Sequence, residues 1–324
     1  MADGPDVADG AVRPAAVRRS IEELRFVVVG AYVADCFVNT PRLPAWGQEY
    51  EARSIRMSPG GKALNQAVAL TRLGAQVTAV GAVGADGVGR DVLAALTRER
   101  VDVSWVESRA DVATTICICL VSNEGDSAIV WHIDDDVAVT PETVHAAAPA
   151  IERADAVLMT FEMPVPAIRE SIGAARSRGA RVFVQPAPVL NDPASAASLP
   201  WDQVDVLVPN EIEARALLGG GHAVSVANLA GALSRNLAVP TVVVTLGASG
   251  CVAHAASVSR RYPAQETVAV DTTGASDAFT ATFAAYLTAG ASEHDAIGAA
   301  QAAAAWAIQR AGGHGSMPTT ASSR

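Results

Sequence analysis

The stretch "VDTTGASDAF", residues 270–279, lies where a β-branched run ends and an alanine-rich segment with helical spacing begins. One interpretation is a helix cap, because Ser276 or Asp277 could accept hydrogen bonds from the free N–H groups of the first helical turn. The other is an anion site, because those N–H groups, small side chains and the positive end of the helix dipole together suit a phosphate. The stretch alone leaves both interpretations open.

Short β-rich runs alternate with helical periodicity along most of the chain. Strands are expected at 25–33, 75–83, 154–160, 180–185, 204–210 and 240–247, and helices at 61–73, 87–99, 164–177, 211–218, 225–237, 275–289 and 292–310. The strands are apolar on both faces and helices separate them, so we predict an α/β fold whose parallel sheet is covered by helices.

Two segments, 33–56 and 101–133, instead alternate polar and apolar residues without intervening helices. They predict a small added sheet, a lid over a site at the strand ends. We find no internal repeat and no linker, so residues 25–318 are expected to form one domain with this lid. Residues 1–24 are acidic and contain prolines, and we expect a disordered arm there. We expect residues 319–324 to form a C-terminal tail.

Charge and cysteine content narrow the class of partner. The net charge of −10 argues against nucleic acid or an anionic membrane as a partner, since both call for basic patches. No apolar run reaches the roughly 18 residues of a membrane span. The four cysteines, at 36, 117, 119 and 251, form no CxxC pair, which predicts a reduced, cytoplasmic protein. A phosphate-bearing ligand would therefore need local N–H groups, a metal or a few placed cations.

One of those cations stands out in the stretch "SPGGKALNQAVAL". Of the 24 basic residues, Lys62 is the only lysine, which indicates a specific need for a compact ammonium group. A helix beginning at Gly61 would present Lys62 and Asn65 on the same face, because they are three residues apart.

Further polar residues follow the ends of several expected strands. Residues just past the carboxyl ends of parallel strands meet in one crevice, so weak individual signals gain weight when they share that position. Taken alone, Asn210 and Glu213 would indicate only a helix cap. The residues that occupy such positions are Asp35, Glu162, Asn210, Glu213, the turn "TLGASG" at 245–250, and Asp277.

At this point the motifs resemble a known family. "GGKALNQAVALTRLGAQVTAVGAVGADGVG" and "DTTGASDAFTATFAAYL" are similar to the two signatures of the PfkB carbohydrate kinases, and "QPAPVL", "PNEIEA" and "TLGASG" resemble the ribokinase subgroup. The resemblance runs from about residue 26 to 318. It implies a Rossmann-like core with a β-sheet lid, ATP with Mg²⁺ as phosphoryl donor, activation by K⁺, a sugar or nucleoside as acceptor, and a homodimer through the lid.

The resemblance also implies residue roles. Asp277 matches the general base, and Gly274, Ala275 and Ser276 match the turn that holds the transferring phosphate. Asp35, Gly61, Lys62, Asn65 and Glu162 match the sugar contacts, while Asn210, Glu213, Thr245 and Gly247 match the nucleotide and magnesium positions. Asp271, Thr273 and Ser316 match a monovalent-cation site. The cap and the anion site of the opening question are then one geometry, since phosphoryl transfer needs charge neutralised beside a base.

Two residues depart from the family pattern. Glycine is usual at Ser276, where serine would strain the turn if the backbone needed a positive φ. Asparagine is usual at Val33, so one sugar hydroxyl loses a partner. The first hypothesis is therefore ATP-dependent phosphorylation of the primary hydroxyl of ribose or a related furanose or ketose. A nucleoside kinase of the same superfamily is the alternative, and a catalytically weak sugar-binding regulator is the second.

Overall fold

The computed structural model describes residues 17–319 except 44, 123–126, 191, 221–223 and 257. Within these residues nine strands form a large sheet in the order β13-β12-β11-β10-β9-β8-β1-β4-β5. The pairs from β11 through β5 are parallel, and β12 and β13 add an antiparallel edge. The strands are β1 (Arg25–Val29), β4 (Gln76–Gly84), β5 (Asp102–Arg109), β8 (Ala156–Thr160), β9 (Arg181–Gln185), β10 (Val206–Leu207), β11 (Thr241–Thr245), β12 (Cys251–Ala255) and β13 (Val258–Tyr262).

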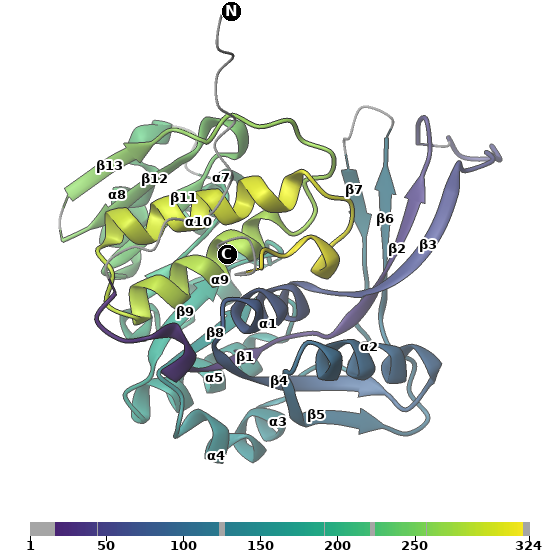
Figure 1. Ribbon diagram of the computed structural model, residues 1–324, viewed down its shortest axis with the longest axis horizontal. Helices are drawn as coiled ribbons and strands as arrows, with labels where there is room; N and C mark the ends of the chain where they lie inside the picture. Colours follow the sequence, from purple (N-terminus) through teal and green to yellow (C-terminus); the bar gives the residue numbers. More distant parts are fainter. Residues whose placement is uncertain are drawn as a thin grey trace, which may run out of the picture.

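Helices cover both faces of this sheet (Figure 1). Alternation along a strand sends neighbouring side chains to opposite faces, so Phe26 and Val28 join one apolar core while Val27 and Val29 join the other. The first core packs against α1 (Lys62–Arg72), α2 (Gly87–Arg98), α9 (Ala275–Thr288) and α10 (Glu293–Ile308). The second packs against α3 (Pro141–Ala146), α4 (Ala148–Ile151), α5 (Val165–Ser177), α7 (Glu211–Leu217) and α8 (Leu229–Leu237); α6 (Pro193–Ala197) follows β9.

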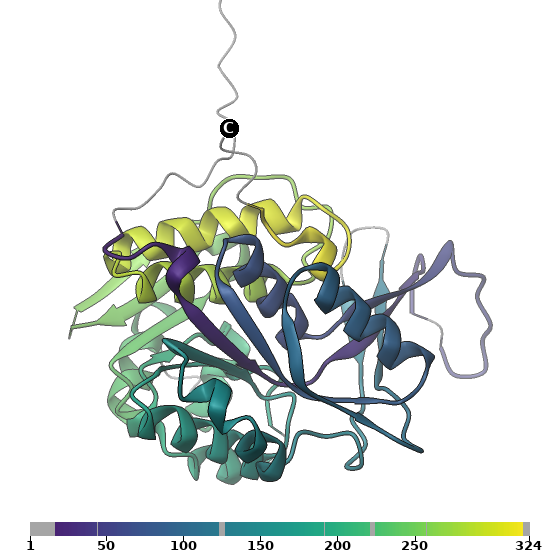
Figure 2. The same ribbon diagram turned by 60° about the horizontal axis from the view of Figure 1, so that its bottom comes forward.

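A second sheet stands beside the large one, and Figure 2 shows its strands projecting from the helix-covered core. Within the described residues its order is β3-β2-β6-β7, formed by β2 (Val33–Asn39), β3 (Ser54–Gly60), β6 (Ile116–Val121) and β7 (Ser127–Val130). The α/β fold with a separate small sheet agrees with the prediction.

The boundaries of the predicted lid need two corrections. The segment 101–133 supplies β6 and β7 to the lid, but its first part, β5, pairs in parallel with β4 in the large sheet. Its alternating pattern reflects an edge position, where exposed side chains alternate with half-buried ones. The predicted strand 25–33 is in fact split, because the chain leaves the large sheet after Val29 and enters the lid at Val33.

The ends of the chain differ from the predicted arm and tail only in part. Residues 1–16 and 320–324 lie outside the described residues. Residues 17–24 are described and pack against the core, since the N–H groups of Arg18 and Arg19 both donate to the carbonyl of Ala289. The predicted disordered arm therefore does not extend to residue 24. No helix within the described ranges is both long and apolar enough to cross a membrane.

Candidate active site

The single lysine forms the centre of one cluster at the carboxyl ends of the strands. Lys62 opens α1, and Glu162 follows β8 by two residues. The Lys62 Nζ donates to Glu162 Oε1 at 2.9 Å, and the Lys62 backbone N–H donates to Oε2 at 3.0 Å. Burial acts to lower the pKa of Lys62, but the charges of Glu162 and Asp277 outweigh it and the pKa is raised. Lys62 is thus held charged, and both side chains are held in fixed orientation.

A second pair joins α1 to α9. Asn65 Nδ2 donates to Asp277 Oδ2 at 2.8 Å, and each side chain belongs to a residue that is only 3% exposed. Among the described residues, neither Asp277 Oδ1 nor Asn65 Oδ1 has a hydrogen-bond partner. Burial raises the pKa of Asp277 to about 6, against the opposing effects of Lys62 and Asn65. A buried carboxylate with one free oxygen and a pKa near neutrality is suited to accept a proton.

The lid contributes Asp35 from β2 to the same place. Asp35 is buried, and a Cβ at Gly60 on the paired strand β3 would overlap its carboxylate. Glycine at position 60 is therefore what admits this side chain. Burial first, and the charge of Glu162 second, raise the pKa of Asp35 to about 7, while Lys62 opposes the shift. The cluster thus holds more carboxylates than cations, which favours a ligand rich in hydroxyl donors over an anion.

The turn before α9 is the segment for which an anion site was predicted. Gly274 has φ +79°, a left-handed conformation that glycine adopts without strain, and Ala275 begins the helix. No side chain among the described residues caps this helix. Ser276 lies inside α9 and does not have a positive φ, so the condition under which this serine would strain the turn is not met. The positive φ of the turn falls on the preceding glycine instead.

The residues predicted for a monovalent cation join two loops. Asp271 Oδ1 accepts from the Thr273 N–H at 2.9 Å, and Asp271 Oδ2 accepts from the Gly312 N–H at 2.8 Å. Ser316 Oγ donates to the Gly313 carbonyl at 2.7 Å. Asp271 therefore ties the start of the anion turn to the segment after α10, and the oxygen-rich loop pair lies beside the site.

Two of the residues predicted to bind the nucleotide are held by local capping. Asn210 caps α7: its side chain accepts from the Glu213 N–H at 2.9 Å, and Glu213 Oε2 accepts from the Asn210 N–H at 2.8 Å. Burial raises the pKa of Glu213 to about 7. Thr245 ends β11 and pairs with Asn210 in an isolated bridge, and Gly247 follows with φ +55°.

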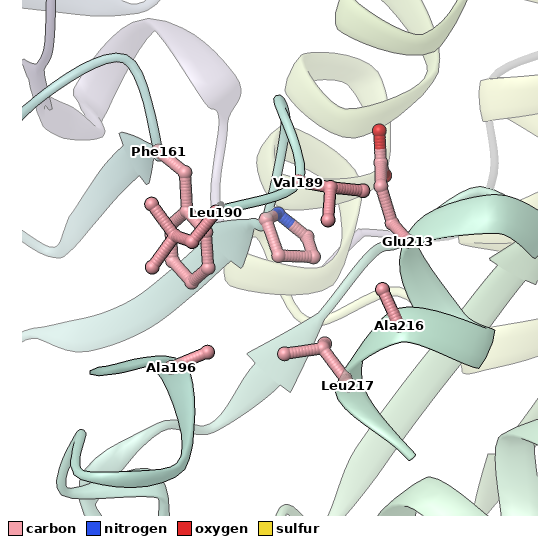
Figure 3. Close-up of a pocket in the computed structure, with 8 residues that line it drawn as sticks. Phe161, Val189, Leu190, Ala196, Glu213, Ala216 and Leu217 are labelled. Carbon is pink, nitrogen blue, oxygen red and sulfur yellow. The ribbon is translucent and has the colours of Figure 1, made fainter. Parts of the chain in front are cut away.

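An apolar pocket lies next to Glu213 (Figure 3). The Glu213 carboxylate points away from Ala216 and Leu217, which line this pocket with other carbon-rich side chains. Apart from Glu213, every lining residue that the structure describes is apolar, so the other side chains of the pocket offer no partners for sugar hydroxyls. The lining residues are Phe161, Pro186, Val189, Leu190, Ala196, Glu213, Ala216 and Leu217.

Three residues of the cluster were not singled out from the sequence. Gln185 ends β9 and donates through Nε2 to Ser276 Oγ at 3.2 Å. The rule on strand ends that found Glu162 applies equally to it. Gly313 lies against Asn65, because a Cβ there would be 3.0 Å from Asn65 Oδ1, and no sequence signal marks it. His314 donates through Nδ1 to the Pro59 carbonyl at 2.6 Å and so joins this segment to the lid.

An α/β core, a lid that carries a buried aspartate, and a carboxylate beside a helix N-terminus with no side-chain cap among the described residues would suit a phosphoryl-transfer enzyme. The model of the pfkB family carbohydrate kinases matches residues 24–320 of the chain. The chain belongs to this family and is an ATP-dependent carbohydrate kinase, which confirms the family and reaction type predicted from the motifs.

Its relatives are ribokinase-like. The chain is 34% identical to the ribokinase of Mus musculus over 271 residues, which cover 82% of each chain. It is 25% identical to the deoxyribokinase of Salmonella typhimurium over 295 residues, 90% of this chain and 95% of that one. The structure of Arabidopsis thaliana ribokinase complexed with ribose and ATP is similar with a TM-score of 0.78 and 26% identity, covering 92% of this chain and 97% of that one.

Proposed function

We propose that this kinase transfers the γ-phosphate of ATP to the primary hydroxyl of a furanose sugar, with Asp277 as the general base. The observation that carries the proposal is the state of Asp277. Its Oδ2 is held by Asn65, its Oδ1 has no partner among the described residues, and it lies in the first turn of a helix whose N-terminus follows Gly274. Base and anion site are therefore adjacent.

The proton and the phosphoryl group are handled by neighbouring atoms. The acceptor oxygen forms its bond to the γ-phosphorus while the bond from that phosphorus to the β–γ bridging oxygen breaks, and ADP leaves with the electron pair. The hydroxyl proton passes to Asp277 Oδ1. The negative charge on the phosphoryl oxygens is met by the backbone N–H groups and dipole at the start of α9.

Acceptor recognition rests on the buried polar cluster. Asp35 and Glu162 offer acceptor oxygens, and Lys62 and Asn65 supply the donors. Val33 precedes Asp35 by two residues on β2, so both side chains are on the same face, and Val33 offers only a methyl group to a ligand. A deoxy position or an apolar base edge would suit this wall, and the similarity to a deoxyribokinase supports including deoxy sugars.

ATP binds in this proposal across Asn210, Glu213, Thr245 and Gly247. Carboxylate oxygens are the donors that Mg²⁺ prefers, and the buried Glu213 would provide them. When bound, Mg²⁺ supplies neutralising charge at the phosphates. The role of Glu213 itself is to keep Asn210 and the start of α7 in place through the reciprocal cap.

K⁺ activates the enzyme in this proposal through Asp271, Thr273 and Ser316. The fit rests on chemistry, since the carboxylate, hydroxyl and carbonyl oxygens of this loop pair are hard donors suited to such a cation. Activity is expected to be higher with K⁺ than with Na⁺ or a bulky organic cation at equal ionic strength. Equal rates in all three would remove this part of the proposal.

A homodimer through the lid is proposed from its outer face. Cross-strand register places several apolar side chains on the face opposite Asp35, and many are exposed. Light scattering should give the molar mass of a dimer. Substituting one of these exposed apolar side chains by a charged residue should give the molar mass of a monomer. These side chains are Cys36, Val38, Ile55, Met57, Ile116, Ile118 and Val130.

We also place the protein in the cytoplasm, because its four cysteines are free and suit a reducing compartment.

The deciding experiment is a coupled ADP-release assay over pentoses, deoxypentoses, hexoses and nucleosides. We expect Mg²⁺-dependent turnover that is highest for a furanose-type acceptor, with phosphate on its primary hydroxyl by ³¹P NMR. Turnover highest for a nucleoside would favour the nucleoside-kinase alternative. Sugar binding by calorimetry without ADP release from any acceptor would favour the regulator.

A further inference from the structure

The anion turn carries a side-chain hydroxyl that backbone recognition of phosphate does not require. Ser276 is the second residue of α9, between the small Ala275 and the base Asp277. The residue is exposed at the open end of the helix. Its Oγ accepts a hydrogen bond from Gln185 Nε2 at 3.2 Å. A side chain from the end of β9 therefore sets the position of this hydroxyl.

A buried neighbour on α1 determines which way the Gln185 amide faces. Gln66 Nε2 donates to Gln185 Oε1 at 2.5 Å, so the Gln185 oxygen is already engaged. The Gln185 NH₂ group must therefore face α9. Gln66 and Gln185 are 0% and 2% exposed, so the arrangement is rigid.

This orientation leaves the serine proton free. Because Gln185 donates, Ser276 Oγ acts as the acceptor, and within the described residues its own O–H has no acceptor. The same helix end lacks a side-chain cap, in contrast to α2, α3, α7 and α10, which begin at capping side chains. In addition, Asp277 Oδ1 is buried without a partner in the described structure. The Ser276 hydroxyl, the N–H groups of the first turn and Asp277 Oδ1 are therefore available to bind a ligand.

We propose that Ser276 is a catalytic residue that donates a hydrogen bond from Oγ to a non-bridging oxygen of the phosphoryl group during transfer, with Gln185 as its positioning residue. The inference rests on the proposed function, since it places the phosphoryl group at the start of α9. It assigns the serine a gain in transition-state binding, where the family resemblance alone raised only the question of strain in the turn. A donor aimed at developing charge contributes to kcat more than to substrate binding.

The first test is steady-state kinetics of Ser276→Ala, Ser276→Gly and Ser276→Thr with the best acceptor. The first two are expected to lower kcat roughly tenfold or more, with KM for sugar and ATP within about twofold, and threonine to retain most of kcat. Thr272→Val removes an exposed hydroxyl four residues earlier and is the matched control, expected to match wild type. Thermal unfolding of all variants checks folding.

The second test separates the positioning role of Gln185. Gln185→Met keeps the length of the side chain but donates no hydrogen bond. It should lower kcat like Ser276→Ala, and the double variant should be little worse than either single variant, because both remove the same interaction. Additive losses would overturn the positioning role.

The third test uses binding alone: calorimetry of Mg²⁺–ADP with and without aluminium fluoride, a mimic of the transferring phosphoryl group. Wild type should bind the fluoride complex about tenfold more tightly than Ser276→Ala does, with equal affinity for ADP alone. If wild type phosphorylates no acceptor, the proposed function fails, and this test still decides the role of Ser276. Equal affinities of the two proteins, no binding by wild type, or unchanged kcat in Ser276→Gly would overturn the inference.

Discussion

The two halves of the site are held in different ways. On the acceptor side, Lys62 pairs with Glu162 and Asn65 with Asp277, so each functional group is positioned by a residue from a distant element. On the nucleotide side, Asn210 and Glu213 position one another within a single helical turn. The acceptor half therefore depends on contacts between distant elements, whereas the nucleotide half combines a local cap with the bridge between Asn210 and Thr245. Substitutions in the first should change chemistry and selectivity, and those in the second should change stability together with ATP affinity.

The largest effect is expected from Asp277→Asn. The substitution keeps the size and the contact with Asn65 but removes the proton acceptor, so kcat should fall at least about 100-fold with little change in KM. Above about pH 7 the variant should also unfold at a higher temperature, because a buried charge is removed. A variant that keeps more than about a tenth of the wild-type kcat would show that Asp277 is not the base.

The pH profile tests the same residue without substitution. Since Asp277 must be deprotonated to act and its pKa is about 6, kcat should fall about tenfold per unit below that pH. Stability should move the other way. The native pKa exceeds the ordinary 3.8, so the native state binds more protons, and the free energy of unfolding falls as pH rises from about 4 to about 6. The raised pKa values of Asp35 and Glu213 add the same sign up to about pH 7.

Urea unfolding across this range, for wild type and Asp277→Asn, separates the contributions. The variant should lose part of the pH slope. A flat kcat profile from about pH 5 to about pH 8 would contradict the assignment of the base.

Asp35→Ala should raise KM for the sugar at least about tenfold, because it leaves hydroxyls of a buried ligand without an acceptor. KM for ATP should stay within about twofold if the halves are independent. Cys36→Ala, one residue along β2 and on the opposite face of the lid, is the control. Equal losses in the two variants would mean that the lid strand is perturbed as a whole.

On the nucleotide side, Asn210→Ala removes the cap of α7 and should cost about 1 kcal/mol of stability. KM for ATP should rise several-fold while KM for the sugar changes little. Ser292→Ala removes the cap of α10, where the serine accepts from the Asp295 N–H, and should lower stability similarly without affecting ATP. A rise in the sugar KM in Asn210→Ala would contradict the independence of the acceptor and nucleotide halves of the site.

The smallest effect is expected from Val33→Asn, which adds a donor and an acceptor to the apolar wall beside Asp35. Preference should shift several-fold toward free ribose over deoxy sugars and nucleosides, measured as ratios of kcat/KM. If wild type already prefers ribose over every other acceptor and the variant keeps that ranking, Val33 does not select the acceptor.

Much of the architecture could be predicted because its signals are local. Helical periodicity placed α1, α2, α5 and α9 to within a residue or two, and the apolar strands indicated the parallel sheet. The lid was harder. The edge strand β5 alternates like a lid strand, and the continuous run 25–33 conceals the change of sheet after Val29. An alternating pattern reports that one face is covered, but not which element covers it.

For the site, the sequence by itself determined the chemical types: one lysine, carboxylates after successive strands, and a small-residue turn before a helix. Only the tertiary structure decided which of them meet. Lys62 and Glu162 are 100 residues apart, and Asn65 and Asp277 are 212 apart, so no local pattern could pair them. The protonation behaviour of Asp277 was decided at the same level, since its raised pKa comes first from burial, and burial is a property of the packed fold rather than of neighbouring residues.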